Sequence, residues 1–189
     1  ALPALAAEKV EQWINLMPKN TVGIIAFKNM PELLADWDKS SFGKFMQDEE
    51  TKRWLEPMKE EGELPWDKYF KGVYGTSLHD TMKDETGPAV AFIVIDETEE
   101  MEKSKSVPFI GLSDASQNQP KQEEHKRKHR EHLKKEQHPD LKESTLDIAG
   151  VSVSIATASE EADAPWVDSF CFVDGVMIEA TNRKLMEYM

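Results

Sequence analysis

The chain of 189 residues is long enough for a domain with a hydrophobic core, and its 39% hydrophobic content excludes disorder throughout. Its formal net charge of −13 disfavours a general nucleic-acid binder, because the summed field repels polyanions. The single cysteine excludes an internal disulfide, and no apolar run reaches the roughly 18 residues that a membrane-spanning helix needs.

The first seven residues, ALPALAA, fit two interpretations. Ala4-Leu5-Ala6 matches the A-x-A pattern of a signal-peptide cleavage region, which predicts export. The same residues could instead begin a helix, because Val10, Trp13 and Met17 follow at helical spacing. Both interpretations stay open.

The run from Thr21 to Phe27, TVGIIAF, predicts a strand that is buried on both faces and central in the sheet, because it is continuously apolar. Three helical segments should follow: one at 31–38, a short one after Ser40, and one at 49–56 that Asp48 caps. The last helix is expected to bury a stripe of Trp54, Leu55 and Met58.

The region 63–87 is interrupted by glycines, and residues 77–80 resemble a capping box that opens a short helix. A second apolar strand is predicted at 89–95 and a third at 107–112. The acidic run 96–102 between them is expected to be a solvated loop.

Residues 116–139 differ from the rest and are predicted to be a charged helical insertion. Between Lys121 and Lys142 the chain has eight Lys or Arg and five Asp or Glu residues, a charge of +3 against −16 elsewhere. Good helix formers predict a helix, but Leu133 is its only large apolar residue, which excludes a core helix. We expect the helix to project into solvent, to cross between elements, or to cover an acidic surface of its own domain or of a neighbouring copy.

The last stretch predicts a β-hairpin that runs into a helix. Asp174-Gly175 suits a two-residue turn with positive φ, which places Cys171 opposite Ile178 and predicts a buried thiol. Asn182 can cap the helix that begins at Arg183. Because this helix is short, we expect the sequence to be the N-terminal part of a longer chain.

Two further strands at 145–148 and 151–157, the second of them half-exposed, bring the total to about seven. The elements predict a single α+β domain over residues 1–189. Its sheet should be largely antiparallel, with six or seven strands, helices packed on one face, and one protruding charged helix.

Several of these motifs occur together in one known family. The stretch 18–58, with its apolar strand, its Ser41-Phe-Gly43 step and its capped helix, resembles the opening of a family of large exported bacterial proteins of unknown function. The chain is also similar to that family at Gly87-Pro-Ala-Val-Ala-Phe92 and in the hairpin 173–176 followed by Ala180-Thr-Asn-Arg183. The resemblance covers about half of the chain. It implies export and an α+β module that continues further, and it carries no activity.

The charged helix holds the candidate metal ligands. His125, His129 and His132 can share one helical face and could bind a transition metal through their imidazole nitrogens. The alternative is a solvated helix face, because Lys and Arg residues surround the histidines and nothing apolar shields them. The basic run HKRKHR lacks interleaved aromatic residues, so we expect no nucleic-acid partner.

These observations favour a non-catalytic interaction or scaffolding module, placed in the periplasm or at the cell surface, that holds a protein partner or self-associates. One alternative is a small-molecule or metal binder that uses the His-rich helix. Another is a hydrolytic enzyme with an unidentified site, although no nucleophile elbow, phosphate loop, dinucleotide pattern or zinc spacing is present. A cytoplasmic location is the alternative to export. No cofactor other than such a metal, and no integral membrane segment, is expected.

Overall fold

The computed structural model describes residues 2–58, 71, 87–94, 108–159 and 165–189. The chain divides into two compact units: residues 1–28 with 87–189, here called the sheet unit, and residues 29–86, the inserted unit. The predicted capping box at 77–80 and the acidic loop 96–102 lie outside the described residues.

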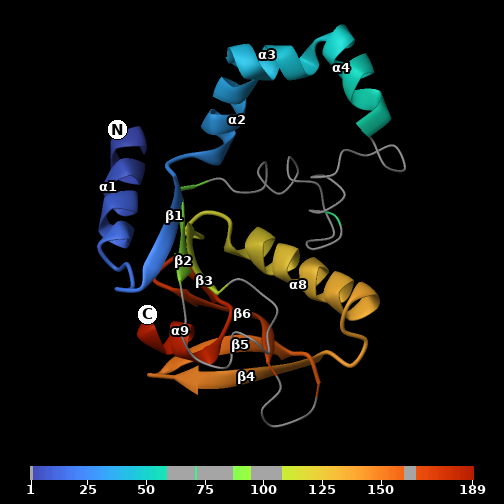
Figure 1. Ribbon diagram of the computed structural model, residues 1–189. Helices are drawn as coiled ribbons and strands as arrows, with labels where there is room; N and C mark the ends of the chain where they lie inside the picture. Colours follow the sequence, from blue (N-terminus) through green and yellow to red (C-terminus); the bar gives the residue numbers. More distant parts are fainter. Residues whose placement is uncertain (1, 59–70, 72–86, 95–107, 160–164) are drawn as a thin grey trace. The chain divides into compact units, whose positions relative to one another are not determined.

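The sheet unit contains one seven-stranded sheet, and the predicted α+β class is confirmed (Figure 1). Its strand order is β1-β2-β3-β7-β6-β5-β4, and all neighbouring pairs are antiparallel. The strands are β1 (Thr21–Phe27), β2 (Ala89–Val94), β3 (Phe109–Asp114), β4 (Lys142–Ile148), β5 (Val151–Thr157), β6 (Trp166–Val173) and β7 (Val176–Ala180).

The C-terminal hairpin forms as predicted. Asp174 and Gly175 have φ values of 49° and 78°, the left-handed conformations that a tight primed turn requires. Cys171 pairs with Ile178 across the hairpin. The Asn182 side chain then accepts a hydrogen bond from the Leu185 N–H and caps α9 (Arg183–Tyr188).

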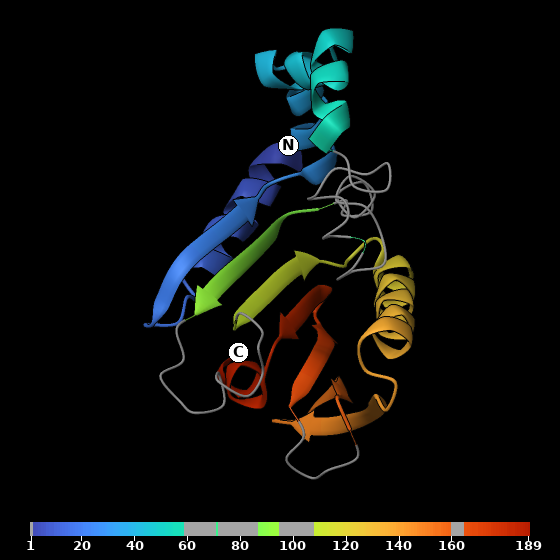
Figure 2. The same ribbon diagram turned by 45° about the vertical axis from the view of Figure 1, so that its right-hand side comes forward.

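One face of the sheet carries the main hydrophobic core, which α1 (Leu2–Ile14) and α9 cover. Figure 2 shows α1 and α9 on the opposite side of the sheet from α8 (Gln119–Glu136). Helix formation at residues 2–14 agrees with the helical interpretation of the N-terminal sequence. Cys171 is buried in this core as predicted. The helices contribute Val10, Trp13, Leu185 and Met186, which pack with strand residues such as Phe92 and Ile110.

The strand at 21–27 forms, but the prediction that it is central and buried is wrong. Within the described sheet, β1 is an edge strand with β2 as its neighbour, and Val22, Ile24 and Ile25 are 61%, 42% and 47% exposed. The central position belongs to β7, which lies between β3 and β6. A continuous apolar run indicates a strand but does not determine which strands flank it.

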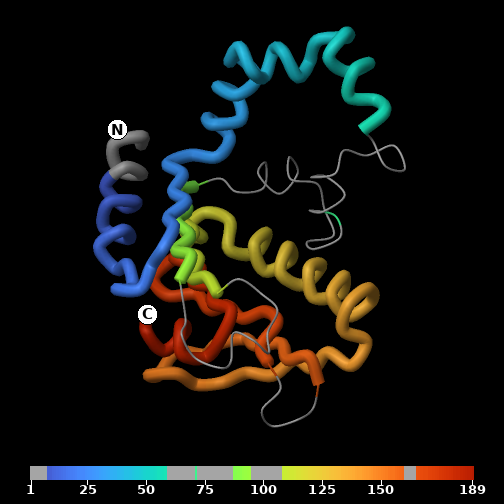
Figure 3. The backbone as a smooth tube through the Cα atoms, in the orientation of Figure 1, coloured from blue at the N-terminus to red at the C-terminus, as the bar shows by residue number. Residues whose placement is uncertain are grey.

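The charged helix forms as predicted, but the prediction that it protrudes is wrong. α8 lies against the second face of the sheet, so helices cover both faces, and Lys126, His129, Arg130 and Leu133 are buried. In Figure 3 the chain runs from the end of α8 into β4. Because α8 covers β5, Ala156 is fully buried, and β5 is not the half-exposed strand that its alternation predicts.

The described part of the inserted unit is a run of short helices: α2 (Met30–Lys39), α3 (Ser41–Gln47), α4 (Glu49–Leu55) and the 3₁₀ helix η1 (Glu56–Met58). Side chains of Asn29, Ser40 and Asp48 accept hydrogen bonds from the first turns of α2, α3 and α4, which confirms the Asp48 cap. A Cβ at Gly43 would lie 1.9 Å from the Trp37 carbonyl oxygen, so the contact between α2 and α3 requires glycine.

None of the helices in the described part of the chain combines the length and the apolar character needed to cross a lipid bilayer.

Candidate functional site

The predicted site helix, α8, contacts the sheet through a polar stripe instead of an apolar one. The buried stripe comprises Gln122, Lys126, His129, Arg130 and Leu133, whose spacing follows the helical period. The sheet face beneath it carries Asp168 of β6 and Glu179 of β7.

Lys126, Arg130, Asp168 and Glu179 form what we call the buried ion cluster. Lys126 Nζ donates to Asp168 Oδ1 at 2.9 Å and also to Glu179. Arg130 Nε donates to the second oxygen of Asp168 at 2.7 Å. Both cationic side chains are 8% exposed or less, so each charge is taken out of water and matched by a carboxylate.

Arg130 makes further hydrogen bonds to β4 and β5. Its Nη1 donates to Ser154 Oγ at 2.8 Å and to Glu143 at 3.1 Å, while its Nη2 donates to the Ser154 carbonyl at 3.1 Å. The guanidinium also lies 4.8 Å from the Phe170 ring centroid, a cation–π distance. The helix therefore covers an acidic surface of its own domain, one of the placements that the sequence analysis left open.

The cluster fixes the ionisation of its members. Burial alone would raise the pKa of Asp168, but the charges of Lys126 and Arg130 and their hydrogen bonds outweigh it and lower that pKa to about 2. Burial alone would lower the pKa of Lys126, but Asp168 and Glu179 outweigh it and hold that pKa above its ordinary value. Both groups are therefore charged at neutral pH and satisfied by one another.

The three predicted metal ligands lie on α8 but differ in exposure. His129 is buried, whereas His125 and His132 are partly buried. Burial, followed by the nearby charge of Lys126, lowers the pKa of His129 to about 4, so its imidazole is neutral at pH 7. Among the described residues, no group of three or more His, Cys, Asp or Glu side chains is arranged to hold a metal ion. Metal binding by this set stays a prediction.

A second feature, which the sequence analysis missed, lies on the inserted unit. Trp37, Phe42, Phe45 and Trp54 are all exposed, and we call them the aromatic surface; Trp54 is 68% exposed. The Trp37 and Phe42 rings meet edge to face with centroids 5.0 Å apart, and Phe42 lies 6.3 Å from Phe45. The prediction that Trp54, Leu55 and Met58 form a buried stripe is wrong, because Trp54 and Met58 are exposed and only Leu55 of the three is buried.

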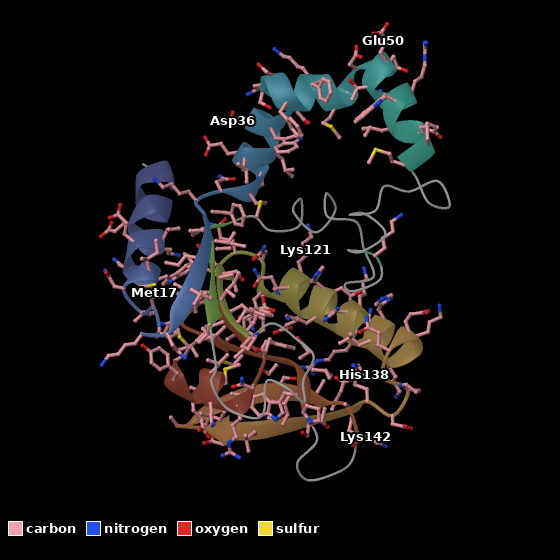
Figure 4. The ribbon with its side chains drawn as sticks, in the orientation of Figure 1. Met17, Asp36, Glu50, Lys121, His138 and Lys142 are labelled. Carbon is pink, nitrogen blue, oxygen red and sulfur yellow. The ribbon has the colours of Figure 1, made fainter. Side chains whose placement is uncertain are left out.

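Charged side chains accompany the aromatic surface. Residues 29–58 contain seven Asp or Glu and four Lys or Arg. Figure 4 labels two of the acidic residues, Asp36 on α2 and Glu50 on α4. The aromatic surface therefore lies in a mainly acidic setting.

Comparison of the chain with protein-family models, with curated proteins and with solved structures finds no match. The resemblance to exported bacterial proteins stays a prediction.

Proposed function

We propose that the chain is a non-catalytic interaction module that holds a protein partner on the aromatic surface of α2, α3 and α4. The observation that carries this proposal is the exposure of Trp37, Phe42, Phe45 and Trp54 within three consecutive helices. Large exposed apolar groups that gather on one part of a protein are typical of interaction sites.

The residue types suit a protein interface. Trp and other aromatic side chains contribute most to binding energy, because they remove a large apolar area from water and lose few rotamers. The contact between Trp37 and Phe42 holds two rings in place before a partner arrives, which reduces the entropy lost on binding. The acidic excess of residues 29–58 favours a partner whose apolar contact surface has a basic rim.

The buried ion cluster supports a structural role for α8 over a catalytic one. Asp168 is 6% exposed at its side chain, and each of its oxygens accepts a hydrogen bond from a cation of α8. A catalytic carboxylate needs access to its substrate and a proton that it can exchange near the working pH. Asp168, with a pKa of about 2 and two bound cations, has neither property.

The test is affinity capture with the tagged chain followed by titration with the purified partner. The ALPALAA start leads us to propose export as well, so the capture is made from the envelope fraction of the source cells. Phe42→Ser and Trp54→Ser should each weaken binding about tenfold or more, which corresponds to about 1.4 kcal/mol. Calorimetry should give a negative heat-capacity change, because apolar surface is buried.

Lys44→Ser and Lys52→Ser are matched controls on α3 and α4, since they change charged residues of the same helices. They should leave the affinity within about threefold, as is typical of charges at an interface rim. Binding that survives both aromatic substitutions would contradict the proposal, as would a partner that the control variants lose equally.

A further inference from the structure

The sheet that the described strands form has two edges, and these differ in how they are protected from pairing with other chains. β4, at one edge, carries Lys142, Glu143 and Asp147, and charged residues on an edge strand discourage edge-to-edge association. β1, at the other edge, has the sequence TVGIIAF and carries no charge. Its exposed Ile24 and Ile25 leave apolar surface on both faces of the strand.

From this contrast we infer that β1 pairs antiparallel with β1 of a second copy about a twofold axis, so that two seven-stranded sheets become one. This is an interaction surface separate from the aromatic surface, and it does not rest on the function proposed above. An edge strand presents unpaired N–H and C=O groups, and a second strand would satisfy them.

The regular part of β1 sets the register of the pair. The ladder between β1 and β2 shifts between Thr21 and Gly23, so the strand is regular from Gly23 to Phe27. This five-residue segment is centred on Ile25. Antiparallel pairing about that centre places Ile25 opposite Ile25 of the second copy.

The same register is complementary in size and in charge. It sets Gly23 opposite Phe27 of the second copy and Ile24 opposite Ala26, so each of these pairs joins a large side chain to a small one. Lys28 follows this segment directly, so its two copies lie at opposite ends of the paired strands and no like charges face each other across the axis.

Pairing of β1 with β1 of a second copy is more favourable than pairing of β1 with β4 of a second copy. Pairing β1 with β4 of another molecule would place Lys142, Glu143 and Asp147 beside an uncharged strand. It would also leave free edges from which a filament could grow, whereas a twofold pair closes. The net charge of −13 opposes association, but charges further apart than about 8 Å are largely screened at physiological salt.

Sedimentation equilibrium of the whole chain over a range of concentrations tests the pairing. The chain should form a dimer, and Ile25→Lys should raise the dimer Kd more than about tenfold, because two lysines would then face each other across the axis. Thr145→Lys is the matched control: it adds the same charge at an exposed position on β4, and the dimer should persist. A chain that stays monomeric at all concentrations, or a dimer that Ile25→Lys leaves intact, would overturn the inference.

Disulfide trapping tests the register and stays informative if Ile25→Lys impairs folding. In a Cys171→Ser background, Ile25→Cys places two thiols opposite each other at a Cα separation of about 4.5–5.5 Å, within disulfide range. Oxidation should yield a covalent dimer for Ile25→Cys and none for Thr145→Cys. Trapping at neither position would overturn the inference. Phe42→Ser and Trp54→Ser should leave the dimer unchanged, which separates this result from the partner-binding proposal.

Discussion

The ionisation of His129 depends on the burial of α8 against the sheet. This residue is buried on the sheet side of the helix, and burial and the charge of Lys126 keep it neutral, with a pKa lowered from 6.5 to about 4. Burial and the charge of Lys126 therefore oppose protonation of the imidazole in the folded state and outweigh the opposite effect of Asp168.

The stability of the fold should fall as the pH is lowered from about 6.5 to about 4. In that window the unfolded chain binds a proton at His129 and the folded chain does not, so acid favours unfolding. The loss should be about 3 kcal/mol at most, from a pKa difference of about 2.5 units. Urea unfolding between pH 7 and pH 4 measures it.

Two variants isolate this contribution. His129→Gln removes the titrating group and should flatten the pH dependence in that window. His132→Gln changes a partly buried histidine on the same helix and should retain the slope. An unchanged slope in His129→Gln would show that another group is responsible.

At the scale of the element, Asp168 is the carboxylate that both buried cations of α8 share, because it accepts hydrogen bonds from Lys126 and from Arg130. Asp168→Asn should therefore lower the free energy of unfolding by about 3–5 kcal/mol, since it leaves two buried cations with less negative charge. Equilibrium urea unfolding gives this value.

The control for that prediction is Glu124→Gln on the same helix. Glu124 pairs with Arg127 at an exposed position, where solvent screens the charges, so its substitution should change the free energy of unfolding much less than Asp168→Asn does. If Asp168→Asn costs no more than the control, the cluster does not hold α8 in place.

The helix itself could be predicted from the sequence, but its docking on its own domain stayed one of three open placements because the helix has no apolar stripe. The pattern that identifies the docking is ionic. Lys126 and Arg130 are four residues apart, and the hairpin register places Glu179 opposite Phe170, whose side chain lies on the same face as Asp168. This face of the sheet is acidic, and α8 is basic on one side. Pairing the two by charge would have placed α8 correctly.

Sequence patterns predicted correctly those features whose interactions join residues close in sequence. The Asp174-Gly175 turn and the Asp48 and Asn182 caps depend on residues close in sequence, and all three form. The placement of β1 and the exposure of Trp54 depend on which distant segments pack nearby. Hydrophobic periodicity holds no information on such pairings, so both were predicted incorrectly.

At the scale of the whole molecule, the inserted unit enters the sheet unit between two adjacent strands. β1 and β2 are antiparallel neighbours, and Phe27 pairs with Ala89. The two ends of the insertion are therefore close enough for a short hairpin loop to replace it.

We predict that replacing residues 29–86 with Asn-Gly leaves the sheet unit folded. Among the described residues, its core comprises residues on α1, α9 and the sheet, and none of these residues belongs to the insertion. Cooperative urea unfolding and a retained near-ultraviolet signal from buried Trp13 would show this. A second variant with a twelve-residue Gly/Ser linker controls for strain in the short loop. Loss of cooperative unfolding in both variants would contradict the prediction.

The position of β7 has a consequence for synthesis of the chain. Within the described sheet, β7 is the strand that joins β1, β2 and β3 to β6, β5 and β4, yet it is the last of these seven strands to be translated. Until residues 176–180 leave the ribosome, β3 and β6 each have an edge without its neighbour. The nascent chain must therefore hold two half-sheets apart from each other, and from other nascent chains, until residues 176–180 emerge.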